Sequence, residues 1–363
     1  GTTNELDGIV FTDLNTGYAV GTHGTILKTI NGGLNWNALV SGTTQRLLYS
    51  CFTSADTGYA VGDYGTILKT INSGASWLPQ TSSTSAWLTQ ICFIGSDTGY
   101  ISGFGGTILK TIDGGTHWMT QISGTTAYLS GVFFLNSNEG YVVGGSGTIL
   151  KTTDGGINWN PQTSGITSQL YCPYFVSPST GFITGVNSTI LKTTNGGVTW
   201  NAQTVGASLL EPIVFTDSLT GYVSGIGGKI FKTTNGGTTW VNMPSGGYEF
   251  LTGMCFASST EGYIVGTNGT ILKLTAATGV IETQKESVLA VYPNPFSSQA
   301  TLSFNKDNWY EVKIIDVMGN EIRKFNFKGK EFIVAKEDIS PGIYFVQATD
   351  PQENSYTKKI IIQ

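Results

Sequence analysis

The sequence contains very few arginines and histidines. Only two of its 363 residues are arginines, Arg46 and Arg323, and only two are histidines, His23 and His117. Guanidinium groups are the preferred bidentate partners of carboxylates and phosphates, so a binding site built from several neighbouring arginines is excluded. Two histidines without a Cys-x-x-Cys pair do not make an ordinary zinc site. We therefore expect no metal and no cofactor.

Long apolar runs and clusters of basic residues are also missing. No apolar stretch reaches the roughly 18–20 residues that a membrane-spanning helix needs. The net charge is −5, and the 19 lysines and arginines are scattered along the chain. This pattern argues against nucleic acid as a partner.

What the sequence does contain is one motif repeated seven times. A glycine followed by an aromatic residue recurs at intervals of 41, 41, 41, 41, 40 and 41 residues. The seven pairs begin at Gly17, Gly58, Gly99, Gly140, Gly181, Gly221 and Gly262. A period near 40 built from short β-type runs is typical of a propeller with one four-stranded blade per repeat. We predict an all-β chain with a seven-bladed β-propeller over residues 1–284.

The first repeat shows where its four strands lie. Runs rich in β-branched and aromatic residues cover Leu6–Phe11, Gly17–Val20, Thr25–Thr29 and Trp36–Val40, and Gly, Asn or Asp fills the gaps. The seventh repeat departs from this pattern, because Ile281 stands where tryptophan is expected. We expect residues 279–284 to complete the seventh blade weakly, without a strand from the N-terminus.

The four cysteines fall at related positions of the repeat. Cys51, Cys92 and Cys255 occupy the place that Val10 holds in the first repeat, and Cys172 lies two residues earlier in its own repeat. A cysteine at a position otherwise apolar behaves as a small hydrophobe. We predict buried free thiols, with disulfide bonds as the alternative.

Six repeats carry a Gly-rich turn that ends in tryptophan. The tryptophans are Trp36, Trp77, Trp118, Trp159, Trp200 and Trp240. Glycine supplies the positive φ of the turn, an Asn or Asp side chain bonds its amides, and the tryptophan folds back as an apolar plug. The motif resembles the Asp-box (BNR) hairpin of sialidase-like propellers, with Asp113 and Asp154 matching strictly. The resemblance implies a turn staple on the face away from known active sites.

The chemistry of those enzymes is not carried over. A sialidase holds its substrate's carboxylate with three arginines, whereas Arg46 is the only arginine of the repeats. Xyloglucanase-type propellers need two carboxylates across a cleft between two propellers. The scattered acids show no pair at a recurring blade position: Glu5, Asp63, Glu211 and Glu249. We therefore expect no enzyme, with an exported carbohydrate-active enzyme of unrecognised type as the alternative.

Over residues 6–275 the repeat resembles the photosystem II stability and assembly factor family of seven-bladed propellers. The shared elements are Gly-Tyr-x-Val-Gly, Gly-x-Ile-x-Lys-Thr and Asp-Gly-Gly-x-x-Trp. Plant and cyanobacterial members grip a photosynthetic subunit with an arginine-rich patch, which this chain lacks. The resemblance implies the architecture and a general habit of binding a partner, but not the photosynthetic role. We interpret the lysine that recurs after Gly-Thr-Ile-Leu as structural, either solvated or bonded to a turn.

Positions that differ from blade to blade are free to specialise, and several of them gather in loops that share one face of a propeller. Those before the recurring leucine of the first strand include Glu5, Arg46, Trp87, Tyr128 and Phe250. Tyr171 follows that leucine, and the turns from the second to the third strand hold His23, Asp63, Tyr64 and Phe104. Aromatic residues beside one arginine and a few acids are typical of a recognition surface, for a protein or a sugar. The alternative is that the aromatics only plug the mouth of the pore.

The composition changes near residue 281. Residues 1–280 hold nine basic and thirteen acidic residues, and residues 281–363 hold ten and eleven, so the second stretch is far more densely charged. We predict a second domain over residues 287–363, a small Ig-like β-sandwich. Its predicted strands are Leu289–Tyr292, Ala300–Phe304, Glu311–Asp316, Glu321–Phe327, Glu331–Ala335, Gly342–Thr349 and Ser355–Ile362.

Four motifs follow one another in this second domain. They contain Tyr292, Pro293, Asn294 and Pro295, then Gly319, then Gly342 and Tyr344, and finally Lys358 and Lys359. Together they resemble the C-terminal sorting domain of the type IX secretion system of Bacteroidota. The resemblance implies export across the outer membrane to the cell surface or the extracellular space. It implies as partners the translocon, its outer-membrane shuttle and the sortase that removes the domain. The predicted function is an exported, non-catalytic propeller that binds a protein or a glycan.

Overall fold

The computed structural model of the chain describes residues 2–275, 281–283, 289–316, 319–352 and 355–363. They belong to two compact units, Gly1–Thr283 and Gln284–Gln363. The first unit contains seven four-stranded antiparallel sheets, and the second contains one five-stranded sheet. The predicted all-β class, with seven propeller blades and a small β domain, is confirmed.

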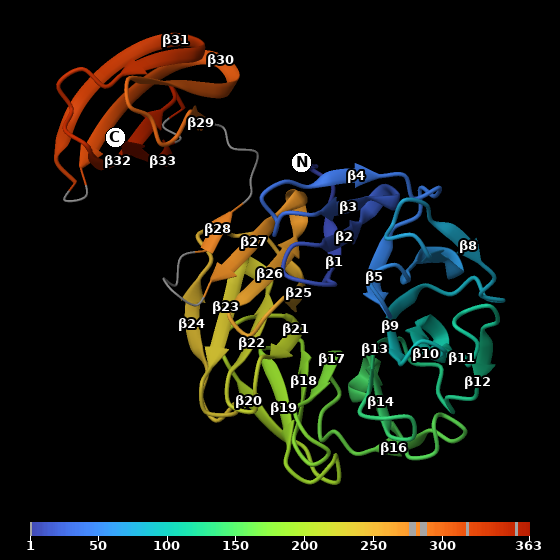
Figure 1. The fold of residues 1–363 in the computed structure, drawn as a ribbon. Helices are drawn as coiled ribbons and strands as arrows, with labels where there is room; N and C mark the ends of the chain where they lie inside the picture. Colours follow the sequence, from blue (N-terminus) through green and yellow to red (C-terminus); the bar gives the residue numbers. More distant parts are fainter. Residues whose placement is uncertain (1, 276–280, 284–288, 317–318, 353–354) are drawn as a thin grey trace. The chain divides into compact units, whose positions relative to one another are not determined.

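Each blade runs in chain order from an inner strand to an outer strand, and the blades surround a common axis (Figure 1). Blade 1 has β1 (Leu6–Phe11), β2 (Gly17–Gly21), β3 (Ile26–Thr29) and β4 (Asn37–Leu39). Blade 2 has β5 (Leu47–Phe52), β6 (Gly58–Gly62), β7 (Ile67–Thr70) and β8 (Leu78–Gln80). Blade 3 has β9 (Leu88–Ile94), β10 (Thr98–Gly103), β11 (Ile108–Thr111) and β12 (Met119–Gln121). Blade 4 has β13 (Leu129–Phe134), β14 (Gly140–Gly144), β15 (Ile149–Thr152) and β16 (Asn160–Gln162).

The last three blades keep this order. Blade 5 has β17 (Leu170–Phe175), β18 (Gly181–Gly185), β19 (Thr189–Thr193) and β20 (Asn201–Thr204). Blade 6 has β21 (Leu210–Phe215), β22 (Gly221–Gly225), β23 (Lys229–Thr233) and β24 (Val241–Pro244). Blade 7 has β25 (Leu251–Phe256), β26 (Glu261–Gly266), β27 (Ile271–Thr275) and β28 (Ile281–Thr283). The pairing of β28 with β27 confirms that the chain completes blade 7 from its own continuation.

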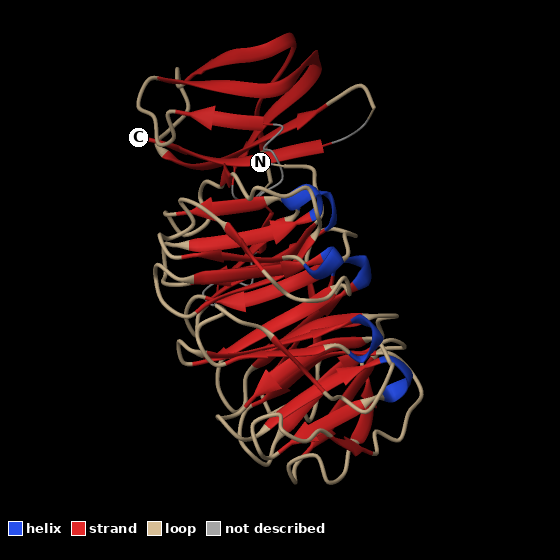
Figure 2. Ribbon diagram, turned by 90° about the vertical axis from the view of Figure 1, so that its right-hand side faces the viewer, coloured by secondary structure: helices blue, strands red, loops and turns tan. Residues whose placement is uncertain are grey.

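Short 3-10 turns connect the second and third strands in six blades. They are η1 (Thr22–Gly24), η2 (Asp63–Gly65), η3 (Phe104–Gly106), η4 (Gly145–Gly147), η5 (Ile226–Gly228) and η6 (Thr267–Gly269). Figure 2 shows these turns in blue along one side of the propeller. We call this side the 3-10 face.

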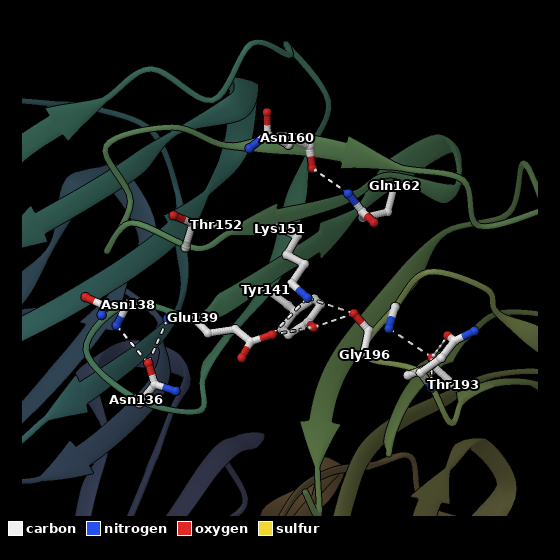
Figure 3. A network of polar contacts seen from close by, with 12 residues as sticks. Asn136, Asn138, Glu139, Tyr141, Lys151, Thr152, Asn160, Gln162, Thr193 and Gly196 are labelled. Atoms are coloured by element: carbon white, nitrogen blue, oxygen red, sulfur yellow. Dashed lines mark hydrogen bonds and ion pairs between the residues drawn. The ribbon is translucent and has the colours of Figure 1, made fainter. Parts of the chain in front are cut away.

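Neighbouring blades are fastened together at the Asp-box turns (Figure 3). Tyr141 of β14 and Lys151 of β15 both donate to the carbonyl oxygen of Gly196 in the next blade, at 2.8 and 2.9 Å. Glu139 lies 2.8 Å from the Lys151 ammonium and balances its charge. A single turn carbonyl therefore receives two hydrogen bonds from the preceding blade.

The same contact closes the ring. Tyr263 and Lys273 of blade 7 donate to the carbonyl oxygen of Gly32 in blade 1, at 2.9 and 3.3 Å. Equivalent lysine contacts to a turn carbonyl are made by Lys28, Lys69, Lys110 and Lys192. The interpretation of the repeated lysine as a turn-bonding, structural residue is confirmed for these positions.

The tryptophan of each Asp box packs behind this contact. Phe134 stacks at 3.8 Å on Tyr100 of the preceding blade and meets Trp159 edge-on at 5.9 Å. Trp159 is only 7% exposed. The predicted plug is thus one member of an aromatic triplet that spans two blades.

Loss of one interblade lysine contact has a moderate expected effect. Lys110 donates to the Gly155 carbonyl oxygen at 2.7 Å, and methionine would keep its apolar stem without the charge. We expect Lys110→Met to lower the free energy of unfolding by about 1–3 kcal/mol, because a hydrogen bond to a charged group has this typical value. Chemical denaturation measures it. Lys229→Met, at the exposed start of β23, is the control and should change stability by less than about 0.5 kcal/mol. Equal losses in the two variants would contradict the structural role.

The second unit differs from the predicted strand pattern. Its strands are β29 (Leu289–Tyr292), β30 (Gln299–Asp316), β31 (Glu321–Ala335), β32 (Gly342–Thr349) and β33 (Ser355–Ile362). The prediction of seven short strands is wrong, because four of them are the halves of β30 and β31. The β30–β31 pairing passes through an irregularity between Ser303 and Asn308 and then continues. The pair therefore stays one long hairpin where the sequence suggested two breaks.

The sheet of this unit nearly closes on itself around an apolar core. Phe296 forms a parallel β-bridge to Ile362. The Asn294 side chain makes two hydrogen bonds to β33. Its Nδ2 donates to the Lys359 carbonyl oxygen at 2.9 Å, and its Oδ1 accepts from the Ile361 N–H at 2.8 Å. The buried core residues include Leu302, Phe304, Tyr310, Val312, Ile314, Val346 and Ile360.

The other motif residues take varied positions in this unit. Tyr292 donates to Glu331 at 2.9 Å, and Tyr344 donates to the Ser340 oxygen at 2.9 Å. The remaining motif positions lie at the start of β32, in the turn after β30 and on the exposed part of β33: Gly342, Gly319, Lys358 and Lys359.

Candidate ligand-binding cavity

A β-bulge marks the beginning of every inner strand. In blade 1, Leu6 pairs with Gly21 and Gly8 pairs with Val20, so Asp7 is left without a partner in β2. The same register shift occurs in the other six blades. A bulge takes the extra side chain out of the normal alternation of a strand. The bulge residues all line one cavity: Asp7, Leu48, Thr89, Ser130, Tyr171, Glu211 and Thr252.

This cavity has a volume of about 310 Å³ and is lined from all seven blades, so it lies on the propeller axis. Residues of η2 and η3 also line it, which places its mouth on the 3-10 face. Six aromatic residues line it. One is Tyr49, and the other five are here called the aromatic collar: Trp87, Phe104, Tyr128, Tyr171 and Phe250. Phe104 lies 4.8 Å from Trp87 and 4.1 Å from Tyr128 between ring centroids. Trp87 is still 41% exposed and is therefore accessible to a partner.

Arg46 is the only arginine or lysine that lines the cavity among the described residues. Its Nε donates to Asp7 Oδ2 at 2.9 Å, and its NH2 group contacts both Asp7 Oδ1 and Glu5, the latter at 3.0 Å. The guanidinium is thus held by the carboxylates of Glu5 and Asp7, which flank Leu6 at the start of β1. This pairing holds the guanidinium in place although the Arg46 side chain is 36% exposed.

Burial changes the acidity of the carboxyl groups around the cavity. It raises the pKa of Glu211 to about 8, and the nearby charge of Asp7 acts in the same direction. Burial also raises the pKa of Asp7 to about 6, because it outweighs the lowering effect of Arg46. The pKa of Asp63 is raised by burial as well. The site therefore contains carboxyl groups that titrate near neutral pH.

The phenols are affected in the same way. Burial, with the Glu211 carboxylate second, raises the pKa of Tyr128 to about 12. Tyr171 shows the same direction of shift for the same two reasons. Both side chains are thus neutral hydrogen-bonding groups at physiological pH.

The structure brings together most of the predicted binding residues. Glu5 adjoins the cavity through Arg46. His23 and Tyr64 do not line it, since each is the central residue of a 3-10 turn with φ of 57° and 54°, and Tyr64 is 65% exposed. Those that line the cavity are Arg46, Asp63, Trp87, Phe104, Tyr128, Tyr171 and Phe250.

Sequence reasoning missed two acidic residues of the cavity. Asp7 and Glu211 hold the same position, directly after the first leucine of their inner strands. The statement that no acidic pair recurs at one blade position is therefore wrong. The bulge explains the error. In a regular strand, a residue next to the leucine would point to the opposite side of the sheet, and the bulge changes this alternation. An alignment of the repeats at that leucine shows that Asp7 and Glu211 share the bulge position.

The four cysteines are free in the structure, as predicted, but they are half-buried and not buried. They lie on inner strands, and Cys172 lines the cavity. Burial raises the pKa of Cys172 to about 11 and that of Cys92 to about 11. These thiols are consequently protonated and poor nucleophiles at neutral pH.

Two family models match the chain. The model described as photosynthesis system II assembly factor YCF48 matches residues 1–79, 36–126, 75–163 and 162–244. The chain belongs to this family. The model of a secretion system C-terminal sorting domain matches residues 290–363. The second match identifies a protein that is exported by type IX secretion to the cell surface or the extracellular space.

Solved structures share the fold at low sequence identity. YCF48 bound to D1 peptide and YCF48 from Cyanidioschyzon merolae are each 19% identical over 76% of this chain, with TM-scores of 0.64, and are covered over 93% and 96% of their lengths. PorZ, an essential bacterial surface component of the type-IX secretion system of Porphyromonas gingivalis, has a TM-score of 0.54 at 12% identity. The match covers 96% of this chain and 58% of PorZ.

One curated relative matches a short stretch. An endo-acting ulvan lyase from Formosa agariphila is 38% identical over 78 residues, which is 21% of this chain and 15% of the lyase.

Within the described residues, no helix is long and apolar enough to cross a membrane, and no group of three potential metal ligands is present.

Proposed function

We propose that this exported propeller is a non-catalytic binding module that holds a protein or a glycan partner at the axial cavity. The observation that carries the proposal is the aromatic collar around a cavity open to the 3-10 face. Cavities of 300 Å³ and more, with apolar walls and a few polar groups, are typical ligand sites. The solved YCF48 bound to D1 peptide supports the proposal, because a propeller of the same family takes a peptide.

A second set of partners serves export. We propose that the C-terminal unit is recognised by the type IX translocon and its outer-membrane shuttle, and that a sortase then removes it. The match to the sorting-domain model supports these contacts.

One observation favours the alternative of a carbohydrate-active enzyme. Asp7 and Glu211 bring two carboxyls of raised pKa into one cavity, and acid–base catalysis on sugars uses such pairs. The enzyme would release products from a polysaccharide, whereas a binding module would only retain it.

Substitution of the collar tests the binding site. We expect Trp87→Ala with Tyr128→Ala to weaken binding of the partner by about 1–4 kcal/mol, because aromatic residues at a contact contribute that much to association. Thermal unfolding should stay close to that of the parent. Retention on a panel of immobilised polysaccharides and surface peptides measures binding, and sugar release is assayed in the same wells.

Trp118→Ala is the control for this experiment. Trp118 is a buried Asp-box tryptophan, 5% exposed, so its loss should cost about 3–5 kcal/mol of stability. It should leave binding unchanged in the molecules that remain folded. A collar variant that binds normally, or that melts far below the parent, would support the pore-plug interpretation. Product release would favour the enzyme.

A further inference from the structure

We propose that the cavity receives a positively charged side chain, the lysine or arginine of an exposed segment of a partner protein. This inference rests on the proposed binding function and specifies its ligand. It follows from the charges, from the order of groups along the axis and from the bulge positions.

The charges around the cavity are unbalanced. One guanidinium faces four carboxyl groups, and Arg46 already binds two of them, Asp7 and Glu5. Asp63 Oδ1 is buried without a hydrogen-bond partner. Glu211 has no side-chain partner among the hydrogen bonds and ion pairs of the described residues, and it lines the cavity. Two carboxyls are thus left to bind a ligand, and a buried carboxyl that is neutral in the empty cavity can ionise when a cation arrives beside it.

The groups are stacked in an order that suits a long basic side chain. Trp87, Tyr128 and Phe250 precede the inner-strand leucine and stand at the mouth. The acidic bulge position comes two residues later, about 7 Å along a strand. Apolar residues two further positions along also line the cavity: Ile9, Ile213 and Met254. Tyr49 and Gln90 line it at the position in between. Methylene groups would contact the collar, where a cation also gains from the aromatic faces, and the charge would reach the carboxyls.

A sugar fits this order less well. Its hydroxyl groups are distributed over the whole ring, so those facing Ile9, Ile213 and Met254 would lose hydrogen bonds to water. An anionic polysaccharide would find no unpaired basic group among the described lining residues, because Arg46 is already bound by Asp7 and Glu5.

The acids at the bulge are not required by the fold. In three other blades the same position holds a hydroxyl that donates to the inner-strand leucine carbonyl of the next blade. Thr89 bonds Leu129 at 2.8 Å, and Ser130 bonds Leu170 at 2.7 Å. Thr252 makes the same contact to Leu6 at 2.6 Å. Asp7 and Glu211 replace this stabilising residue with a carboxyl, which indicates a role in binding.

Binding of a cation should also move a proton. The charged and titratable groups facing Glu211 are Asp7, Glu5 and Arg46, with the Tyr128, Tyr171 and Cys172 side chains beside them. Burial keeps Glu211 largely protonated at pH 7, and an arriving cation favours its ionised form. Affinity should therefore rise between pH 6 and pH 8.5, and a proton should be released on binding near neutral pH.

The test uses the full chain and four blocked seven-residue peptides of glycine and serine that differ at the central residue. The central residue is lysine, arginine, acetyl-lysine or glutamate, and a glucosamine oligomer is a fifth probe. Calorimetry at pH 6, 7 and 8.5, in buffers of different ionisation enthalpy, gives affinity and proton release. We expect the lysine or arginine peptide to bind at least tenfold more tightly than the acetyl-lysine peptide, and the glutamate peptide not to bind.

Variants connect the effect to Glu211. Glu211→Thr, which introduces the residue type that other blades use, should weaken lysine binding at least tenfold and abolish the proton release. Glu211→Gln serves the same purpose if the threonine variant does not fold. Asp97 is an exposed carboxyl at the opposite face, so Asp97→Asn should change neither the affinity for the lysine peptide nor the proton release.

Each other result overturns the inference. If the acetyl-lysine peptide binds as tightly as the lysine peptide, or if neither cationic peptide binds, a cationic side chain is excluded as the ligand. Glu211-dependent binding of the glucosamine oligomer alone assigns the charge to an amino sugar. A neutral or anionic ligand whose binding needs Trp87 and Tyr128 would refute the inference and leave the proposed function intact.

Discussion

Deleting residues 287–363 is expected to leave the protein in the periplasm. The sorting-domain model matches residues 290–363, and this stretch lies in a compact unit with its own apolar core. The propeller closes its ring without that unit, through the Tyr263 and Lys273 contacts to Gly32. The truncated chain should therefore fold and yet lose export completely. Cell fractionation followed by detection of the propeller measures the outcome.

Two controls make this result specific. The truncated protein should melt within a few degrees of the propeller transition of the full chain, which shows that lost export is not misfolding. Fusing residues 287–363 to an unrelated folded reporter should carry that reporter to the surface or the medium. Normal secretion of the truncated chain would refute the role of the unit in export.

The propeller itself could be predicted almost strand by strand. A repeat multiplies each local signal by seven, so the glycine-aromatic pair and the Asp-box tryptophan fix the register of each blade even where one blade is atypical. The recurring lysine was correctly interpreted because both partners of its contact recur with the repeat. The lysine on the strand and the turn of the neighbouring blade therefore stay at constant spacing.

The second unit lacks that advantage. Polar stretches near Lys306 and Lys330 suggested strand ends, but β30 and β31 pair across them. The pairing is interrupted between Ser303 and Asn308 and then resumes, and single-sequence patterns do not distinguish such an irregularity from the end of a strand.

The cavity could be predicted in part. Trp87, Tyr128 and Phe250 precede a recurring leucine, and their shared blade position was enough to place them on one face. Asp7 and Glu211 share one blade position but were not recognised as two residues that line the same cavity. Their orientation depends on a bulge, which is a property of backbone pairing and has no residue signature here. His23 and Tyr64 hold the central position of their 3-10 turns and do not line the cavity.

The buried carboxyl of Glu211 is expected to make the propeller less stable as the pH rises. Its ordinary pKa is 4.5, and burial raises it to about 8 in the folded chain. Between these values the unfolded chain is ionised while the folded chain keeps the proton, so unfolding releases a proton. Stability due to Glu211 should be complete below pH 4.5 and lost as the pH rises through about 8, with a total change on the order of 5 kcal/mol. Seven of the eight tryptophans lie in the propeller, so tryptophan fluorescence during urea denaturation at pH 5, 7 and 9 reports it.

Glu211→Gln provides the decisive comparison, because the amide has nearly the same shape and cannot ionise. The variant should match the parent at pH 5 and be clearly more stable at pH 9, since it avoids burying a negative charge beside Asp7. Asp97→Asn removes an exposed carboxyl and should follow the parent at every pH. If the parent and Glu211→Gln lose stability in parallel between pH 5 and pH 9, the carboxyl of Glu211 is ionised at neutral pH. It would then have to be solvated through the cavity mouth, and the raised pKa of Glu211 would be wrong.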